Sequence, residues 1–355
     1  MGGRRGRRGA IAAGAVAGAV LVSGIGLWAT DSWPFRESYC WGAWEQDSGA
    51  DFLGDDGLSR SGSARSATES APPSASRHHA SCTVTVTSTI PDDDSDEPLS
   101  FKEQVTVEYG PAPTGAEDRR AWIARYFDGS GARLPDGLDG LVAGDRAMLV
   151  LPEACDVDGR PAAVTIRSAS TGDGHLGKVA MPFTIGSRSA VTGMLLDAAN
   201  TGTRKAGCAP EKPLRTTSPF VTVPEETESA RSPLCRIPGV TLDFGKGPGY
   251  QEKVGVVDER LQTCSVVWRA PGLPDEQAAQ YVMTAEPRLV ALFEGLPEGV
   301  GDGLVRTECH GRRTVFYANL GSGLEGAGRP DDRTVFTRFT ESVGRRIGCG
   351  SGEGA

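Results

Sequence analysis

Hydrophobic and polar residues alternate along two neighbouring stretches of the chain, 82–90 and 102–109, which flank the turn-like segment 91–94. A period of two with many β-branched residues predicts a β-hairpin. Apolar residues recur at helical spacing in 116–128 and 189–204, which predicts an amphipathic helix in each. Two further strands are predicted over 147–151 and 162–169.

The second half of the chain is predicted to repeat this order. A helix is expected over 275–293, where Pro287 would introduce a kink, and another over 332–346. Strands are expected over 254–257, 264–268, 304–308 and 314–319. Each half then forms an antiparallel sheet packed with two helices, an α+β architecture in which sheet and helices bury each other's apolar faces.

The cysteines show the same twofold repetition. One set is Cys40, Cys82, Cys155 and Cys208, and the other is Cys235, Cys264, Cys309 and Cys349. Between its second and third cysteines each half carries Leu-Pro-Asp-Gly (134–137) or Leu-Pro-Glu-Gly (296–299). Such self-similarity indicates one supersecondary design used twice. We therefore divide the chain into module 1 (36–209), a Pro-, Thr- and Glu-rich linker (210–232), module 2 (233–350) and a loose tail (351–355).

The eight cysteines favour disulfides over a zinc or dithiol site, because no C-x-x-C pair is present. Four cysteines in a module allow three connectivities. We expect first to second and third to fourth, because both pairs then link neighbouring elements. Each bridge would stabilise the fold by about 3–4 kcal/mol in the chain-entropy account. Structural disulfides also indicate an exported protein.

The N-terminus combines a charged start with an uncharged span. Its arginines are Arg4, Arg5, Arg7 and Arg8. Residues 9–30 carry no charge, and a helix of that length is about 33 Å long, enough to cross a hydrocarbon core of ~30 Å. The arginines would keep residues 1–8 in the cytoplasm, so that the rest of the chain emerges on the far side.

A cleaved signal peptide is the alternative for this segment. The chain has no convincing A-x-A site near 23–31 and no cysteine there for lipidation. The paired arginines resemble a twin-arginine signal, but Gly9 and Ala10 stand where hydrophobic residues should follow. We expect an uncleaved signal anchor, in which Gly14 and Gly18 form a G-x-x-x-G pair for possible homo-association of the span.

Residues 46–80 are mostly small and polar, with almost no large apolar side chains. Such a segment buries too little surface to offset its ordering entropy, which predicts a disordered insert in module 1. Module 2 has nothing comparable between Cys235 and Cys264.

The net charge of the chain is −9, and beyond the N-terminal arginines 33 basic residues face 46 acidic ones. An acidic ectodomain is a poor binder of nucleic acid and is repelled by anionic lipids and wall polymers. We expect no nucleic-acid partner.

One sequence resemblance spans most of the chain. It rests on the charged start, the single hydrophobic span, Ser-Tyr-Cys-Trp-Gly-Ala-Trp (38–44) and Leu-Pro-Asp-Gly-Leu-Asp-Gly-Leu (134–141). In these features the chain resembles uncharacterised membrane-anchored extracytoplasmic proteins of actinobacteria, of the streptomycete type. That family has no known activity, so the resemblance implies no catalytic residue.

Two G-x-G-x-x-G strings are candidates for a phosphate-binding loop. They are formed by Gly172, Gly174 and Gly177, and by Gly321, Gly323 and Gly326. In each case the next predicted helix starts well beyond the last glycine, and the order of elements is not βαβ. A glycine turn shared by the two repeats is the interpretation we adopt.

The remaining polar clusters also favour structural roles. The acidic run Asp92, Asp93, Asp94, Asp96 and Glu97 lacks the spacing of a calcium loop and fits a solvated hairpin tip. The histidines are His78, His79, His175 and His310, and no metal-ligand spacing connects them. His310 follows the third cysteine of its module, as Asp156 does in module 1.

Trp41 and Trp44 closely follow Cys40 and could stack on sugars if they were exposed. Packing against the disulfide is the interpretation we adopt, because most tryptophans are largely buried. The second module has Arg236 and Gly239 at the corresponding places.

These patterns favour a membrane-anchored binding or scaffolding protein of the cell envelope. We expect its partner to be another envelope or membrane protein, and we assign no catalytic, cofactor-binding or metal-binding residue. The alternative is a hydrolase-type envelope enzyme whose carboxylates come from distant loops. A third possibility is that the modules act only as a structural spacer. A concave pocket with convergent polar groups and a shifted carboxylate would favour the enzyme.

Overall fold

The structure is a computed structural model of the chain, and it describes residues 38–46, 49–60, 62–92, 95–172, 180–220, 233–238, 250–269, 275–320 and 332–349. The chain divides into two compact units, 1–38 and 39–355. The span expected over 9–30 lies outside the described residues. Among the described residues, no helix has both the length and the apolar character needed to cross a membrane.

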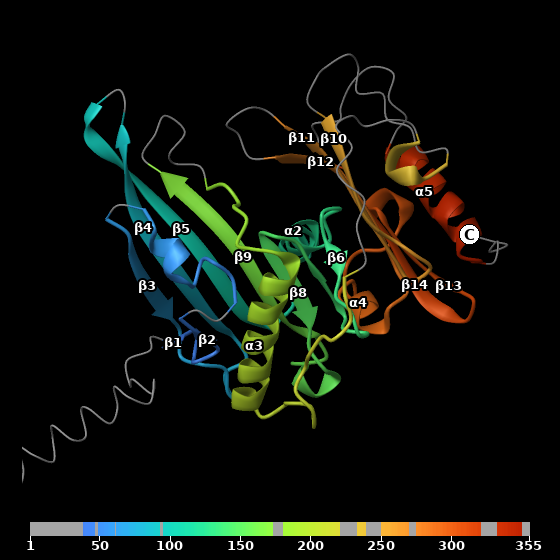
Figure 1. The fold of residues 1–355 in the computed structure, drawn as a ribbon. Helices are drawn as coiled ribbons and strands as arrows, with labels where there is room; N and C mark the ends of the chain where they lie inside the picture. Colours follow the sequence, from blue (N-terminus) through green and yellow to red (C-terminus); the bar gives the residue numbers. More distant parts are fainter. Residues whose placement is uncertain are drawn as a thin grey trace, which may run out of the picture. The chain divides into compact units, whose positions relative to one another are not determined.

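Module 1 is built on a seven-stranded antiparallel sheet with the order β3-β4-β5-β9-β8-β7-β6 (Figure 1). Its strands are β3 (Ala64–Glu69), β4 (Ala80–Asp92), β5 (Ser95–Pro111), β6 (Ala132–Arg133), β7 (Gly140–Val142), β8 (Arg146–Val150) and β9 (Ala162–Gly172). β4 and β5 form the predicted hairpin, paired from Ala80 opposite Tyr109 to Asp92 opposite Ser95. Two short strands precede this sheet, β1 (Ser38–Tyr39) and β2 (Trp44–Glu45).

Module 2 contains a five-stranded antiparallel sheet with the order β10-β11-β12-β14-β13. Its strands are β10 (Tyr250–Val257), β11 (Leu261–Trp268), β12 (Glu276–Thr284), β13 (Leu304–Cys309) and β14 (Arg312–Leu320). In each sheet the first three strands lie side by side in chain order. The third of them pairs with the last strand of the module in sequence, and the strand that precedes the last one in sequence lies on its far side. The two sheets share one connectivity, as a repeated design requires, and β6 and β7 extend the sheet of module 1.

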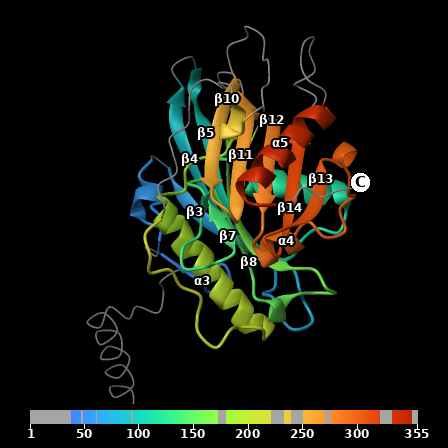
Figure 2. The same cartoon turned by 90° about the vertical axis from the view of Figure 1, so that its right-hand side faces the viewer.

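Helices cover the sheets at three of the four predicted places. The α-helices are α2 (Ala116–Tyr126), α3 (Arg188–Ala206), α4 (Pro287–Ala291) and α5 (Asp332–Arg346). The 3-10 helices are η1 (Asp55–Leu58), η2 (Glu153–Cys155), η3 (Leu234–Arg236) and η4 (Val300–Asp302). α3 packs along β8 and β9, and α5 packs on β14 (Figure 2). The side chains of α3 and α5 complete two separate hydrophobic cores, one in each module.

The helix predicted over 275–293 is wrong. This stretch forms strand β12 and then the short helix α4, which begins at Pro287. β12 lies between β11 and β14, and residues 278–284 are all buried. Pairing on both edges outweighs the weak helical preference of its Ala and Gln residues.

Four disulfides join Cys40 to Cys82, Cys155 to Cys208, Cys235 to Cys264 and Cys309 to Cys349. The expected pairing is therefore confirmed, and four disulfides indicate an oxidising, extracytoplasmic environment. In each module the first cysteine lies in a turn with positive φ, and a glutamate accepts a hydrogen bond from its backbone N–H. Glu69 binds the N–H of Cys40 at 2.6 Å, and Glu252 binds that of Cys235 at 2.9 Å.

The disorder expected over 46–80 does not agree with the structure. This segment contains η1 and β3, and β3 pairs with β4 along its whole length. Phe52 and Leu53 are buried in the core of module 1, and Arg65 donates a hydrogen bond to the carbonyl of Phe52 at 3.0 Å. Pairing with a neighbouring strand and two apolar anchors order a sequence whose composition alone predicts a coil.

A third hydrophobic core joins the two modules. Module 1 contributes residues of α2, β7 and β8, including Ile123, Phe127 and Met148. Module 2 contributes residues from β12 to β14, including Val282 and Phe293. We call this contact the seam. Because each module buries an apolar face there, the two sheets are parts of one folded body.

Candidate functional site

Each module contains an open pocket beside its first helix. The pocket of module 1 has a volume of about 340 Å³. Its lining includes His79, Glu108, Asp118, Trp122 and Arg160. The imidazole of His79 reaches in over Gly110, where an added Cβ would lie 2.6 Å from Nδ1. The missing side chain of Gly110 therefore opens room for this ring.

The pocket of module 2 has a volume of about 430 Å³. Its polar lining consists of Arg260, Glu286, Glu294, Arg312 and Arg313. Its apolar lining includes Ala285, Pro287, Val290 and Ala291. A volume in this range fits a small molecule rather than a macromolecule.

The two pockets occupy equivalent places in the shared connectivity. His79 immediately precedes β4, and Arg260 immediately precedes β11, which is the corresponding strand. The segments that follow β5 and β12 and the helices α2 and α4 supply further lining to their pockets. The turn before the last strand adds Arg160 in module 1 and Gly311 in module 2, where Arg312 and Arg313 at the start of β14 complete the lining. Corresponding elements therefore build both pockets.

The chemistry of the two pockets differs although their position is shared. Module 1 offers the half-buried indole of Trp122 and a mixture of acidic and basic groups. Module 2 offers three arginines against two glutamates beside small apolar residues. The same place in the two modules therefore carries two different linings.

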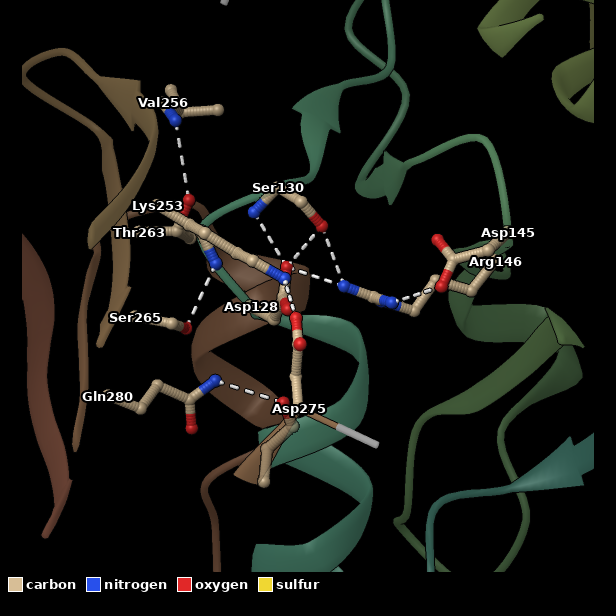
Figure 3. Close-up of polar contacts among 12 residues, drawn as sticks. Asp128, Ser130, Asp145, Arg146, Lys253, Val256, Thr263, Ser265, Asp275 and Gln280 are labelled. Carbon is tan, nitrogen blue, oxygen red and sulfur yellow. Dashed lines mark hydrogen bonds and ion pairs between the residues drawn. The ribbon is translucent and has the colours of Figure 1, made fainter. Parts of the chain in front are cut away.

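The seam holds a cluster of largely buried charges centred on Asp128 (Figure 3). Arg146 contacts Asp128 and Asp145 at 2.5 Å each, and all three side chains are at most one-fifth exposed. Burial favours the neutral acid, yet Arg146, Lys253 and hydrogen bonds from Ser130 hold the pKa of Asp128 below its usual value. Burial, reinforced by the charge of Asp128, raises the pKa of Asp145.

Module 2 faces this cluster with a row of polar side chains. Lys253, Ser265 and Gln280 lie opposite one another on the neighbouring strands β10, β11 and β12. Ser265 Oγ accepts a hydrogen bond from Gly129 N at 3.0 Å, and Gln280 Nε2 donates to the carbonyl of Ala124 at 3.2 Å. Lys253 Nζ contacts Asp275 at 2.9 Å. Burial opposes ionisation of Asp275, but hydrogen bonds from Arg269 and Lys253 set its pKa at about 2.

These seam groups bind one another and the backbone across the two modules. Arg146 engages two carboxylates of opposite pKa shift, Asp128 and Asp145, and neither of them lines the pockets described above. The arrangement therefore stabilises the contact between the modules. Its charged groups pair with one another, whereas Gln280 Oε1 is buried without a hydrogen-bond partner.

The tryptophans beside Cys40 are buried. Trp41 and Trp44 are 8% and 0% exposed, and their indole N–H groups donate to the carbonyls of Ser70 and Met194. Neither presents a face to a sugar. Packing in the core of module 1, which includes this disulfide, agrees with the interpretation adopted from the sequence.

The other candidate residues are scattered. Gly172 ends β9, whereas Gly174, Gly177, Gly321, Gly323 and Gly326 lie outside the described residues, as do His175, Asp93 and Asp94. Asp92 pairs with Ser95 at the hairpin tip. His310 lies in the turn between β13 and β14, packed on Gly348, and its counterpart Asp156 pairs with Arg288 at 2.6 Å.

The repeated Leu-Pro-Asp/Glu-Gly motifs have structural roles. Asp136 accepts hydrogen bonds from Thr217 and Ser218, which ties the start of the linker to module 1. These bonds lower the pKa of Asp136 to about 2. In module 2 the corresponding Glu298 binds Arg306 at 2.6 Å.

One cluster in the described residues has the composition of a metal site. Ligand atoms of Cys235, Glu252 and Cys264 lie within 4.8 Å of one another. The two sulfurs form a disulfide, so no thiolate is available to bind a metal ion. We assign this cluster to the disulfide and its neighbouring glutamate.

Comparison with known proteins identifies no matching family, curated protein or solved structure.

Proposed function

We propose that this protein is a membrane-anchored, extracytoplasmic binding protein of the cell envelope, with residues 9–30 as its anchor. The observation that carries the proposal is the presence of an open pocket at the same place in both modules. A cavity left by imperfect packing has no reason to recur at the same place in both copies of a repeat. A pocket that recurs with a different lining is better explained by contact with a ligand.

The seam supports binding over hydrolysis. A hydrolase of the carboxylate type needs two carboxyl groups beside the bond to be cleaved. Asp128 and Asp145 have opposite pKa shifts, as such a pair would, but both are held by Arg146 inside the seam. Because Arg146 already pairs with both carboxylates, the two open pockets are the recognition sites of this proposal.

Site-specific photo-crosslinking of the full-length protein in cells tests the proposal. A photoreactive residue replaces Asp118 at the pocket of module 1 or Ala291 at that of module 2, and the exposed Lys205 on α3 serves as control. We expect adducts of defined mass at one or both pocket positions and none at 205. Identical adducts at all three positions, or none at either pocket, would contradict a binding role.

A further inference from the structure

The pocket of module 2 is rich in arginine although the protein is acidic. Its lining contains Arg260, Arg312 and Arg313 against Glu286 and Glu294. The net charge of the whole chain is −9, so an excess of cations in one concave place is unusual for this molecule. A concave site with an excess of one sign of charge attracts ligands of the opposite sign.

Both glutamates of the lining are already paired. Glu294 contacts Arg313 at 2.8 Å. Glu286 contacts Arg133 from module 1 at 2.5 Å, and Arg260 is farther away at 3.6 Å. Arg133 does not line the pocket, and it also lies 3.8 Å from Asp258, another residue outside the lining. The positive charge of Arg133 and the negative charge of Asp258 therefore leave the charge balance of the pocket unchanged. Arg260 therefore shares a carboxylate that already has a closer partner.

Arg312 carries the unmatched charge. No ion pair or hydrogen bond of its guanidinium is found among the described residues, and its Nε is buried without a hydrogen-bond partner. A buried donor left unpaired costs free energy, and an anion in the pocket would remove that cost. A guanidinium binds carboxylate or phosphate through two parallel hydrogen bonds.

The apolar part of the lining indicates which kind of group can lie beside the anion. Ala285, Pro287, Val290 and Ala291 form a surface of small apolar groups beside the arginines. Ala285 and Val290 are 5% and 3% exposed, so this surface is part of the packed interior. A pocket of about 430 Å³ therefore accepts a short apolar chain next to a charged head group.

We propose that the pocket of module 2 binds a small organic anion, with its carboxylate or phosphate group on Arg312 and Arg260 and its short apolar part against Pro287 and Ala291. This inference rests on the proposed binding function and adds the chemical class of the ligand.

Calorimetric titration of the full-length protein tests the inference. The probes are butyrate, inorganic phosphate and the cation butylamine. We expect butyrate to bind more tightly than phosphate, because only butyrate covers the apolar residues, and butylamine not to bind. Tighter binding of phosphate would show a plain anion site and overturn the apolar part of the proposal. Binding of butylamine as tight as that of butyrate would overturn the role of the charge.

Two arginine variants give a matched comparison. Arg312→Gln removes a side chain without partners in the described residues, so the fold should persist, and we expect the Kd for butyrate to rise at least tenfold. Arg345→Gln makes the same charge change on the exposed side of α5 and should leave the Kd unchanged. Equal effects of both variants, or no effect of Arg312→Gln, would overturn the proposal.

Failure of the calorimetric titration can be distinguished from failure of the photo-crosslinking test of the binding function. If butyrate does not bind but a photoreactive residue at 291 still forms specific adducts, the anionic ligand class is wrong and the binding function stands.

Discussion

Phe127 and Phe293 meet edge to face across the seam, with ring centroids 5.7 Å apart. Each follows the first helix of its module and precedes an acidic residue and a glycine, in Phe-Asp-Gly (127–129) and Phe-Glu-Gly (293–295). In a symmetric dimer, residues near the twofold axis touch their own counterparts. The modules contact each other at this point as two identical subunits would.

Replacing either ring should destabilise the whole body. We expect Phe127→Ala and Phe293→Ala each to lower the free energy of unfolding by about 3–5 kcal/mol, because both rings are fully buried. The double variant should lose about 0.5–1.5 kcal/mol less than the sum, since the ring contact is removed only once. Urea unfolding of the full-length protein measures these losses. Phe127→Ala combined with Phe52→Ala, in the separate core of module 1, should be additive.

Gly129 allows the backbones of the two modules to touch. A Cβ there would lie 1.7 Å from the carbonyl oxygen of Lys253 on β10, so Gly129→Ala must push the seam apart. We expect a loss of about 1–3 kcal/mol in unfolding free energy. Gly193→Ala in α3 is the matched control, because its new methyl group meets no atom within 4 Å. It should stabilise the protein by about 0.5–1 kcal/mol.

Asp128 makes the seam sensitive to acid. Its pKa is lowered in the folded protein, so its contribution to stability is present above the usual Asp pKa of about 3.8 and is lost as the pH falls through the folded value. At neutral pH, Asp128→Asn leaves a buried cation with one partner fewer and should cost about 3–5 kcal/mol. The difference from the parent protein should shrink below pH 4.

Asp145→Asn is the matched control, because Asp145 binds the same arginine but has a raised pKa. Its ionised form is disfavoured by folding, so its contribution to stability falls as the pH rises. We therefore expect a smaller loss at neutral pH than for Asp128→Asn. Equal losses in thermal melts at pH 7 would contradict this assignment.

Asp136 should protect the beginning of the linker from protease. Removing its hydrogen bonds to Thr217 and Ser218 in Asp136→Ala frees the chain next to the exposed Arg215. We expect trypsin to cleave after Arg215 several-fold faster, as followed by mass spectrometry. Asp118→Ala, at an exposed position on α2, should leave the rate unchanged. Because the pKa of Asp136 is about 2, protection should persist at pH 5.

Local patterns in the sequence were enough to predict the β4–β5 hairpin, the helices α2, α3 and α5 and the disulfide pairing. Each of these depends on periodicity or on neighbouring elements. β12 was missed because its buried residues on both faces show no alternation, and its Ala and Gln residues favour a helix. β3 was missed because its order depends on pairing with β4.

The pockets and the seam depend on contacts that join distant segments. One signal was present nevertheless: His79 lies three residues before Cys82, and Arg260 lies four before Cys264. A basic residue near the second cysteine of each repeat indicates a shared position, and His79 was instead assigned to a disordered insert. Ser265 and Gln280 gave no such signal, because their common row exists only once β11 and β12 are paired.

The seam also indicates how this protein arose. A chain with a single module would expose the apolar face that α2, β7 and β8 now bury, and a second copy of itself would offer a matching apolar face to cover it. The ancestral gene product would then have been a homodimer whose assembly depended on concentration. Fusing two such genes through a linker makes the partner permanent and lets each half mutate separately, so that one pocket can become rich in arginine while the other keeps a tryptophan.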